Sequence, residues 1–200
     1  MTNVITRDHL ERSVSYASFR DLINSLLIER KTTGAQQTKE RVQSTRLNAR
    51  LMDRIGHQTV LMPELLDALR KMRERQIWLG LVEAWCMDVA QNIPVIAQMA
   101  VSVPTVSLRL LLRDEHPDIM DAYLTNGSKS IPKIIALKED TLEELWAWGP
   151  RPEAAQTLFM DLKNQGEPMP AVYEAIQSWY SEDKNQTLQH EFFNRIRSGE

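Results

Sequence analysis

The sequence is poor in cysteine: Cys86 is the only one among its 200 residues. A single cysteine excludes a disulfide within the chain, and it excludes redox chemistry that needs two cysteines of the same chain. Nothing in the sequence therefore requires an oxidising compartment, and we expect a cytoplasmic protein.

A strong excess of charge and long apolar runs are also absent. The formal net charge of −3 gives no electrostatic reason to expect nucleic acid or an anionic membrane as a partner. No stretch approaches the roughly 20 apolar residues that a membrane span needs. The first residues, MTNVITRDHLERS, are charged early and lack the apolar run of a signal peptide. We expect a soluble protein that binds neither nucleic acid nor a membrane.

The patterns of common metal and cofactor sites are missing too. The histidines His9, His57, His116 and His190 are scattered, and none has metal-ligand spacing to the cysteine. No glycine-rich phosphate loop followed by lysine and serine or threonine is present. We therefore expect no metal and no cofactor, and we expect His116 to cap a helix or lie on the surface.

Helical periodicity is the first pattern that is present. Apolar residues recur at spacings of three and four between residues 8 and 29, which predicts one helix there. A second helix is expected over residues 38–54, and a third begins at Pro63 and runs to about residue 73. We assign residues 1–75 to an α-helical N-terminal extension.

The period changes at Gln76. The run QIWLGLVEAW is nearly continuous in apolar residues, as in a strand that is covered on both faces. A helix, a strand and a second helix are expected next, and IPKIIAL and TLEELWAW then predict two strands joined by the polar turn KED. A last helix follows GPRP, so the order is β-α-β-α-β-β-α. Residues 76–165 therefore form an α/β domain with parallel strands first, an antiparallel hairpin later and a central mixed sheet.

The remaining residues, 166–200, are expected to form a helical C-terminal tail. Two helical stretches, over residues 171–180 and 187–196, carry apolar side chains on one face. These side chains dock either on the α/β domain or on a second chain, in which case the added helices form a homodimer.

This element order, with Trp85 and Cys86 at the end of the first strand, resembles the thioredoxin fold. Pro94 follows Cys86 by eight residues, where thioredoxins carry the proline that kinks their active-site helix, and SIP at 130–132 stands where they have a cis-proline loop. The strings EAWC.D.AQN.PVI, LLLRDE, MDAYLTNG, SIPK and WGPR also resemble a bacterial thioredoxin-like branch with a helical N-terminal extension. The core resemblance covers residues 76–163, and the site has the single-cysteine pattern WCxDV.

The resemblance implies thiol-disulfide exchange with Cys86 as the nucleophile. A cysteine at a helix N-terminus faces free backbone N–H groups and the positive end of the helix dipole, and both favour the thiolate. A cis bond at Pro132 would place the Ile131 backbone beside the sulfur, where the resemblance implies pairing with an extended substrate strand. The residues expected to bind substrate are Trp85, Met87, Asp88, Ile131 and Pro132.

Three departures from the family weaken that implication. Val89 stands where thioredoxins have their second cysteine, so the chain cannot resolve a mixed disulfide by itself. Gly80 stands where they have a buried acid, and Glu83 cannot replace it because an odd offset points to the other face of the strand. Asp88 places a negative charge near the sulfur and should raise the pKa of the thiol, unless it caps the helix instead.

Two interpretations of Cys86 therefore remain. In the first, Cys86 is a monothiol nucleophile that forms a mixed disulfide with a client protein or a low-molecular-weight thiol and is released by an outside thiol. In the second, it is a small, partly buried apolar residue in a non-catalytic thioredoxin-fold binding or assembly module. Ready reaction at neutral pH would favour the first, and a thiol that titrates near or above about 8.5 would favour the second.

Overall fold

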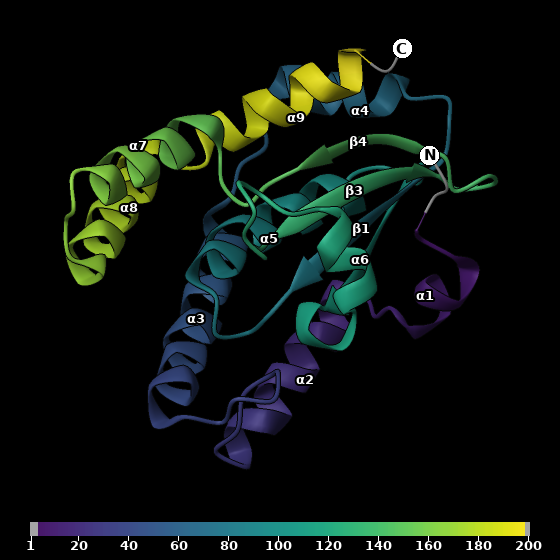
Figure 1. Cartoon of the computed structure of the whole chain (residues 1–200). Helices are drawn as coiled ribbons and strands as arrows, with labels where there is room; N and C mark the ends of the chain where they lie inside the picture. Colours follow the sequence, from purple (N-terminus) through teal and green to yellow (C-terminus); the bar gives the residue numbers. More distant parts are fainter. Residues whose placement is uncertain (1–3, 199–200) are drawn as a thin grey trace.

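A four-stranded mixed sheet forms the centre of the protein, which a computed structural model describes over residues 4–198 (Figure 1). The strands are β1 (Gln76–Val82), β2 (Val106–Leu112), β3 (Lys133–Lys138) and β4 (Glu144–Trp148), and their order in the sheet is β2-β1-β3-β4. β1 is parallel to β2 and antiparallel to β3, and β3 is antiparallel to β4. The predicted α/β class, the order of the elements along the domain and the mixed sheet are confirmed.

The central position of β1 explains its unbroken apolar sequence. It is hydrogen-bonded on both sides, and every residue from Ile77 to Val82 is buried. Helix α5 (Met87–Val101) makes the crossover from β1 to β2. A short 3-10 turn, η1 (Arg113–Glu115), and helix α6 (Pro117–Ala122) follow β2, so the connection between β2 and the hairpin leaves from the edge where Cys86 lies.

Four helices precede the sheet: α1 (Arg7–Arg12), α2 (Tyr16–Ile28), α3 (Lys39–Gln58) and α4 (Pro63–Lys71). In Figure 1, α2 and α3 lie below the sheet in this view, whereas α4 lies above it beside the last helix of the chain. Helix α3 contacts α5, the helix that Cys86 precedes. The N-terminal helices therefore reach both faces of the sheet, and α3 reaches the candidate site.

The single helix predicted over residues 8–29 is wrong, because two helices, α1 and α2, occupy this stretch. Between them, the Val14 N–H donates to the Leu110 carbonyl at 2.9 Å, and the Leu110 N–H donates back at 2.8 Å. Ser15 then caps α2 by accepting a hydrogen bond from the Ser18 N–H at 3.1 Å. The exposed edge of β2 is thus partly paired. This pairing is favoured over the continuous helix that the periodicity predicts.

The C-terminal helices are α7 (Glu153–Asn164), α8 (Met169–Asp183) and α9 (Gln186–Ser198). Phe192 of α9 is fully buried and makes edge-on ring contacts with Trp78, Trp146 and Trp148 of the sheet, at centroid distances of 5.2–5.5 Å. Of the two docking alternatives, the tail therefore uses its apolar face within its own chain. A homodimer through the added helices stays a prediction.

Two expectations about the fold remain, one on membrane spans and one on the domain bounds. Within residues 4–198, no helix combines the length and the apolar character needed to cross a membrane. The division of the chain at residues 75 and 165 stays a prediction.

Candidate functional site

Cys86 lies in the segment that connects β1 to α5. After Val82 the chain makes a turn in which the Cys86 N–H donates to the Glu83 carbonyl at 3.2 Å, and Cys86 is then the N-cap residue of α5. Its own carbonyl accepts the first helical hydrogen bond, from the Ala90 N–H at 3.2 Å. The half-buried sulfur therefore stands at the helix start, as the sequence predicts.

The loop before β3 places a backbone carbonyl beside the sulfur. The Ile131–Pro132 peptide bond is cis, and the Cys86 thiol donates to the Ile131 carbonyl oxygen at a sulfur–oxygen distance of 3.3 Å. Gly149 holds the loop from the other side with φ +112°, and a Cβ atom there would lie only 2.2 Å from the Pro132 carbonyl oxygen. Glycine is thus required at 149 for this close backbone approach.

An open pocket of about 790 Å³ lies over Cys86 and Ile131, and we call it the Cys86 pocket. One wall comes from α3 and another from α8, so segments far apart in the sequence enclose it. Its lining side chains are Ser44, Leu47, Asn48, Arg50, Leu51, Arg54, Trp85, Cys86, Met87, Asp88, Arg113, Lys129, Ser130, Ile131, Arg151, Tyr173 and Gln177. A volume of this size suits a small molecule or a short peptide segment.

Asp88 does not cap α5; it forms a buried ion pair with Arg151. The two guanidinium–carboxylate contacts measure 2.7 and 3.0 Å, and only 5% of the Asp88 side chain and 9% of the Arg151 side chain are exposed. The Tyr180 hydroxyl of α8 donates to the same carboxylate at 3.0 Å, and Asn92 donates to that hydroxyl at 2.9 Å. Burial raises the pKa of the Asp88 carboxyl, and Arg151 opposes that rise.

These surroundings favour the thiol form of Cys86 over the thiolate. Burial first, and the Asp88 carboxylate second, raise the pKa of the Cys86 thiol to about 12. The backbone N–H groups of Val89 and Asp88 and the Arg151 guanidinium lower it by less. The helix-start effect is therefore present, but burial and the neighbouring carboxylate outweigh it.

The positions that depart from the thioredoxin pattern are closed by packing. The Val89 side chain is fully buried. A Cβ atom on Gly80 would lie 2.7 Å from Leu110 Cδ2 and 3.2 Å from Ile134 Cδ1, so no space is left for an acid. The Glu83 carboxylate accepts a hydrogen bond from the Asp114 backbone N–H at 2.9 Å. Within the described residues, neither the second-cysteine position nor the acid position of the family therefore supplies a group to Cys86.

Trp85 forms the rim of the pocket between two arginines. The guanidinium carbon of Arg41 lies 4.1 Å from the centre of its ring, and that of Arg113 lies 4.9 Å away. Arg113 also pairs with Asp114 at 2.6 Å. Asp114 thus holds the Arg113 guanidinium close to the tryptophan that precedes Cys86.

The pocket wall is cationic and partly apolar. Five lining side chains are cations, and Asp88 is the one lining carboxylate. Arg151, Arg113 and Lys129 each pair with a carboxylate, whereas Arg50 and Arg54 of α3 make no ion pair with any residue of the described chain. Leu47 is 54% exposed, and Leu51 lines the same wall. A ligand with acidic and apolar groups fits this wall.

The fold brings most of the expected site residues together. Cys86, Trp85, Met87, Asp88 and Ile131 line the pocket, whereas Pro132 is buried behind it. Sequence reasoning missed the wall residues of α3 and α8. The one available signal is the i, i+4 spacing that places Leu47 with Leu51, and Arg50 with Arg54, along one helix face.

Comparisons with solved structures support the fold. A protein of unknown function from Pseudomonas aeruginosa, known from a 1.5 Å crystal structure, matches with a TM-score of 0.57 and 16% identity over 94% of this chain and 99% of that one. The crystal structure of an HIV epitope-scaffold matches with a TM-score of 0.56 and 16% identity over 92% and 99%. At this identity the likeness concerns the fold alone.

Sequence comparisons supply the family. No curated protein matches this chain. The family model described as thioredoxin matches residues 34–163, which include α3, the Cys86 turn, the cis-proline loop and α7 up to Lys163. The chain therefore belongs to the thioredoxin family.

Proposed function

We propose that this protein is a non-catalytic thioredoxin-fold binding protein whose Cys86 pocket holds an extended, acidic segment of a client protein. The observation that carries this proposal is the thiol's hydrogen bond to the Ile131 carbonyl, at 3.3 Å, in a half-buried place beside Asp88. A thiol that donates a hydrogen bond to a carbonyl is protonated and uncharged, so Cys86 contributes a neutral surface to the pocket.

The weak acidity of Cys86 limits the reactivity of its thiol at neutral pH. Burial and the neighbouring Asp88 carboxylate raise the pKa of the Cys86 thiol from 9.0 to about 12. At neutral pH the thiolate population is then about 10³-fold smaller than that of a free thiol, and the thiolate is the reactive form. This favours binding over exchange at Cys86.

The charge of the pocket supports an acidic client. Arg50 and Arg54 stand one helical turn apart on α3 without a carboxylate partner in the described chain, and Leu47 and Leu51 lie on the same wall. Cations without a partner attract a negatively charged segment, and the leucines offer apolar surface for alternate side chains of an extended strand. The loop residues Lys129 and Ser130, which line the same pocket, supply the polar edge.

The test uses two short peptides, one of alternating glutamate and valine and one of alternating lysine and valine. Fluorescence anisotropy should show that the chain binds the glutamate peptide at least about tenfold more tightly, with weaker binding at high salt. The double variant Arg50→Glu/Arg54→Glu should lose at least about tenfold, or 1.4 kcal/mol. Cys86→Ser should leave the affinity within about twofold.

Arg46→Glu is the matched control, because Arg46 is an exposed arginine of the same helix that does not line the pocket. Equal binding of the two peptides, or an Arg46→Glu variant as weak as the pocket variant, would rule out the acidic client.

Monothiol exchange is the second candidate, and the position of the sulfur favours it. Cys86 lines an open pocket beside a cis-proline loop, where an extended disulfide-containing segment can approach. The Cys86 thiolate would attack one sulfur of a client disulfide, and the other sulfur would leave as a thiolate. An external thiol would then attack the mixed disulfide, take the client sulfur into a new disulfide and return Cys86 to its reduced form.

The pH dependence of alkylation at Cys86 separates the two candidates. The raised pKa predicts a slow rate at neutral pH that continues to rise tenfold per pH unit beyond pH 10, because only the thiolate reacts. A denatured sample, which reports an ordinary cysteine, is the control. A rate in the folded chain that reaches its plateau below about pH 8 would favour exchange instead.

A further inference from the structure

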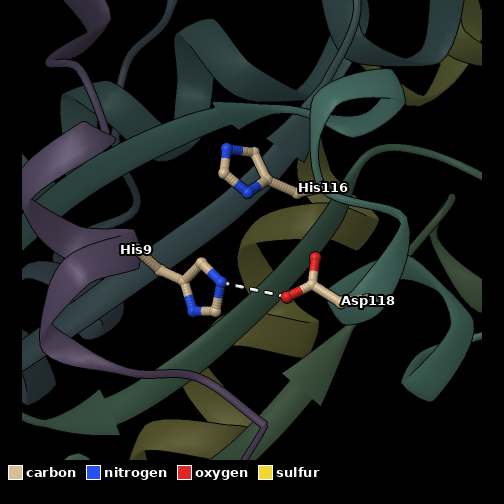
Figure 2. Close-up of side chains that lie close together, drawn as sticks. All are labelled: His9, His116 and Asp118. Atoms are coloured by element: carbon tan, nitrogen blue, oxygen red, sulfur yellow. Dashed lines mark hydrogen bonds and ion pairs between the residues drawn. The ribbon is translucent and has the colours of Figure 1, made fainter.

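Two histidines and an aspartate from distant parts of the chain face one another on the side of the sheet where α1 meets α6 (Figure 2). His9 comes from α1, His116 precedes α6, and Asp118 lies in the first turn of α6. One ring nitrogen or carboxylate oxygen from each lies within 4.8 Å of the other two. The His9 Nε2 atom is 3.0 Å from Asp118 Oδ2, and the two imidazole rings meet edge to face at 5.6 Å.

We propose that His9, His116 and Asp118 form a binding site for a divalent transition-metal ion, with Zn²⁺ as the ion that they suit best. Two imidazoles and one carboxylate are a common three-residue ligand set for Zn²⁺, with water in the fourth position. Bonds of about 2.0–2.2 Å would bring the three ligand atoms within about 4 Å of one another, so small side-chain rotations close the remaining gap.

His116 adds a second imidazole to the pair formed by His9 and Asp118. Its side chain belongs to a residue only 7% exposed, and among the described residues no donor or acceptor makes a hydrogen bond to its ring. Its ring nitrogens therefore make no bond within the described chain that an ion would have to displace. The ring lies against His9, and Figure 2 shows both rings and the Asp118 carboxylate around one space.

His9 can supply its nitrogen without a net change in protons. Its Nδ1 atom lies 3.1 Å from both the backbone N–H and the hydroxyl of Thr6. When Nδ1 accepts the N–H, the ring proton is on Nε2 and is donated to Asp118. A metal at Nε2 takes the place of that proton, which moves to Nδ1 and is donated to the Thr6 hydroxyl oxygen, while the Thr6 N–H gives up its hydrogen bond to the ring. An outer acceptor that fixes the tautomer in this way is the usual support of a metal-bound histidine.

The ligands come from two elements far apart in the sequence, which favours a structural role for the ion. The His9 side chain is 12% exposed and that of Asp118 is 54% exposed, so an ion can enter from solvent and keep a water molecule. A bound ion would join α1 to the start of α6. These two elements are far apart in the sequence, because β1 and β2 lie between them. We expect it to stabilise the docking of the N-terminal helix on the α/β domain.

The test measures Zn²⁺ binding to the metal-free full chain by titration calorimetry, with Co²⁺ absorption as a second readout of ligand geometry. We expect one ion per chain and a rise in the thermal midpoint that grows with free Zn²⁺. His9→Gln is the sharpest variant, because glutamine at the third helical position can keep the capping box with Thr6 while removing the imidazole. It should weaken Zn²⁺ binding by more than the about 10- to 100-fold that loss of an outer partner costs.

Three further variants complete the design. Asp118→Asn should also weaken binding, whereas His190→Ala, at an exposed histidine of α9, should not change it. Cys86→Ser should bind Zn²⁺ as the parent does, because the thiol is no part of this site. The site would be refuted by an absence of stoichiometric binding, by unchanged affinity in His9→Gln and Asp118→Asn, or by loss of binding in Cys86→Ser.

Discussion

The clusters around Cys86 and around His116 each contain a carboxylate, but the two carboxylates differ in how many protein groups bind them. Around Cys86, Asp88 is buried, pairs with Arg151 through two contacts of 2.7 and 3.0 Å and accepts a third hydrogen bond from a tyrosine. Around His116, Asp118 makes one side-chain contact of 3.0 Å with His9 and is 54% exposed, while the buried His116 ring has no hydrogen-bond partner among the described residues.

This difference indicates where an external group can act. Since protein atoms already satisfy the charges beside Cys86, a ligand there gains its contacts from the rim and the α3 wall, where Arg50, Arg54 and Leu47 are open. Near His116, three possible ligand atoms lie within 4.8 Å of one another, so an external ion can bind to the cluster itself. One region is thus suited to bind a segment beside it, and the other to enclose an ion.

The largest expected effect comes from removing the carboxylate of the satisfied cluster. Asp88→Asn leaves the Arg151 guanidinium, 9% exposed, without a counter-charge. Removing one partner of a buried ion pair costs about 3–5 kcal/mol of unfolding free energy. Urea unfolding at neutral pH should show a loss of this size, with an unchanged m-value. A loss below about 1 kcal/mol would mean that water reaches the pair and that the comparison is wrong.

The double variant Asp88→Asn/Arg151→Gln is the matched control. It removes both charges, so it should recover much of the loss that the single variant shows. It also separates charge from burial at the sulfur: Asp88 raises the pKa of Cys86 more than Arg151 lowers it, so the pKa of the thiol should fall. Alkylation of Cys86 at pH 9 should then be faster than in the parent chain.

The sequence predicts the Cys86 cluster well because its parts are close together or at family spacing. Trp85, Met87 and Asp88 flank the cysteine, and the Ile131 loop follows at the distance that thioredoxins show. The acidity of the thiol was not predictable, because it depends on burial and on Asp88 staying beside the sulfur instead of capping α5. Periodicity shows that Leu47 and Arg50 lie on a helix, but it does not show that α3 crosses the mouth of the site.

The His116 cluster was outside the reach of sequence reasoning. His9 and Asp118 are separated by 109 positions, and no spacing rule for metal ligands covers such a distance. Their meeting depends on α1 being turned towards the domain, which in turn depends on Val14 pairing with Leu110 at the edge of β2. The continuous helix expected over residues 8–29 has no such break.

The smallest expected effect comes from the carboxylate of the open cluster. In metal-free solution, Asp118→Asn should cost less than about 1 kcal/mol of unfolding free energy, because an exposed ion pair and a charge in the first turn of a helix each contribute only a few tenths. Urea unfolding measured beside Asp88→Asn checks this difference directly. Added Zn²⁺ should widen the gap between Asp118→Asn and the parent chain, since only the parent gains binding energy in full. A metal-free loss as large as that of Asp88→Asn would show that His9 and Asp118 form a closed ion pair, with no coordination position left for an ion.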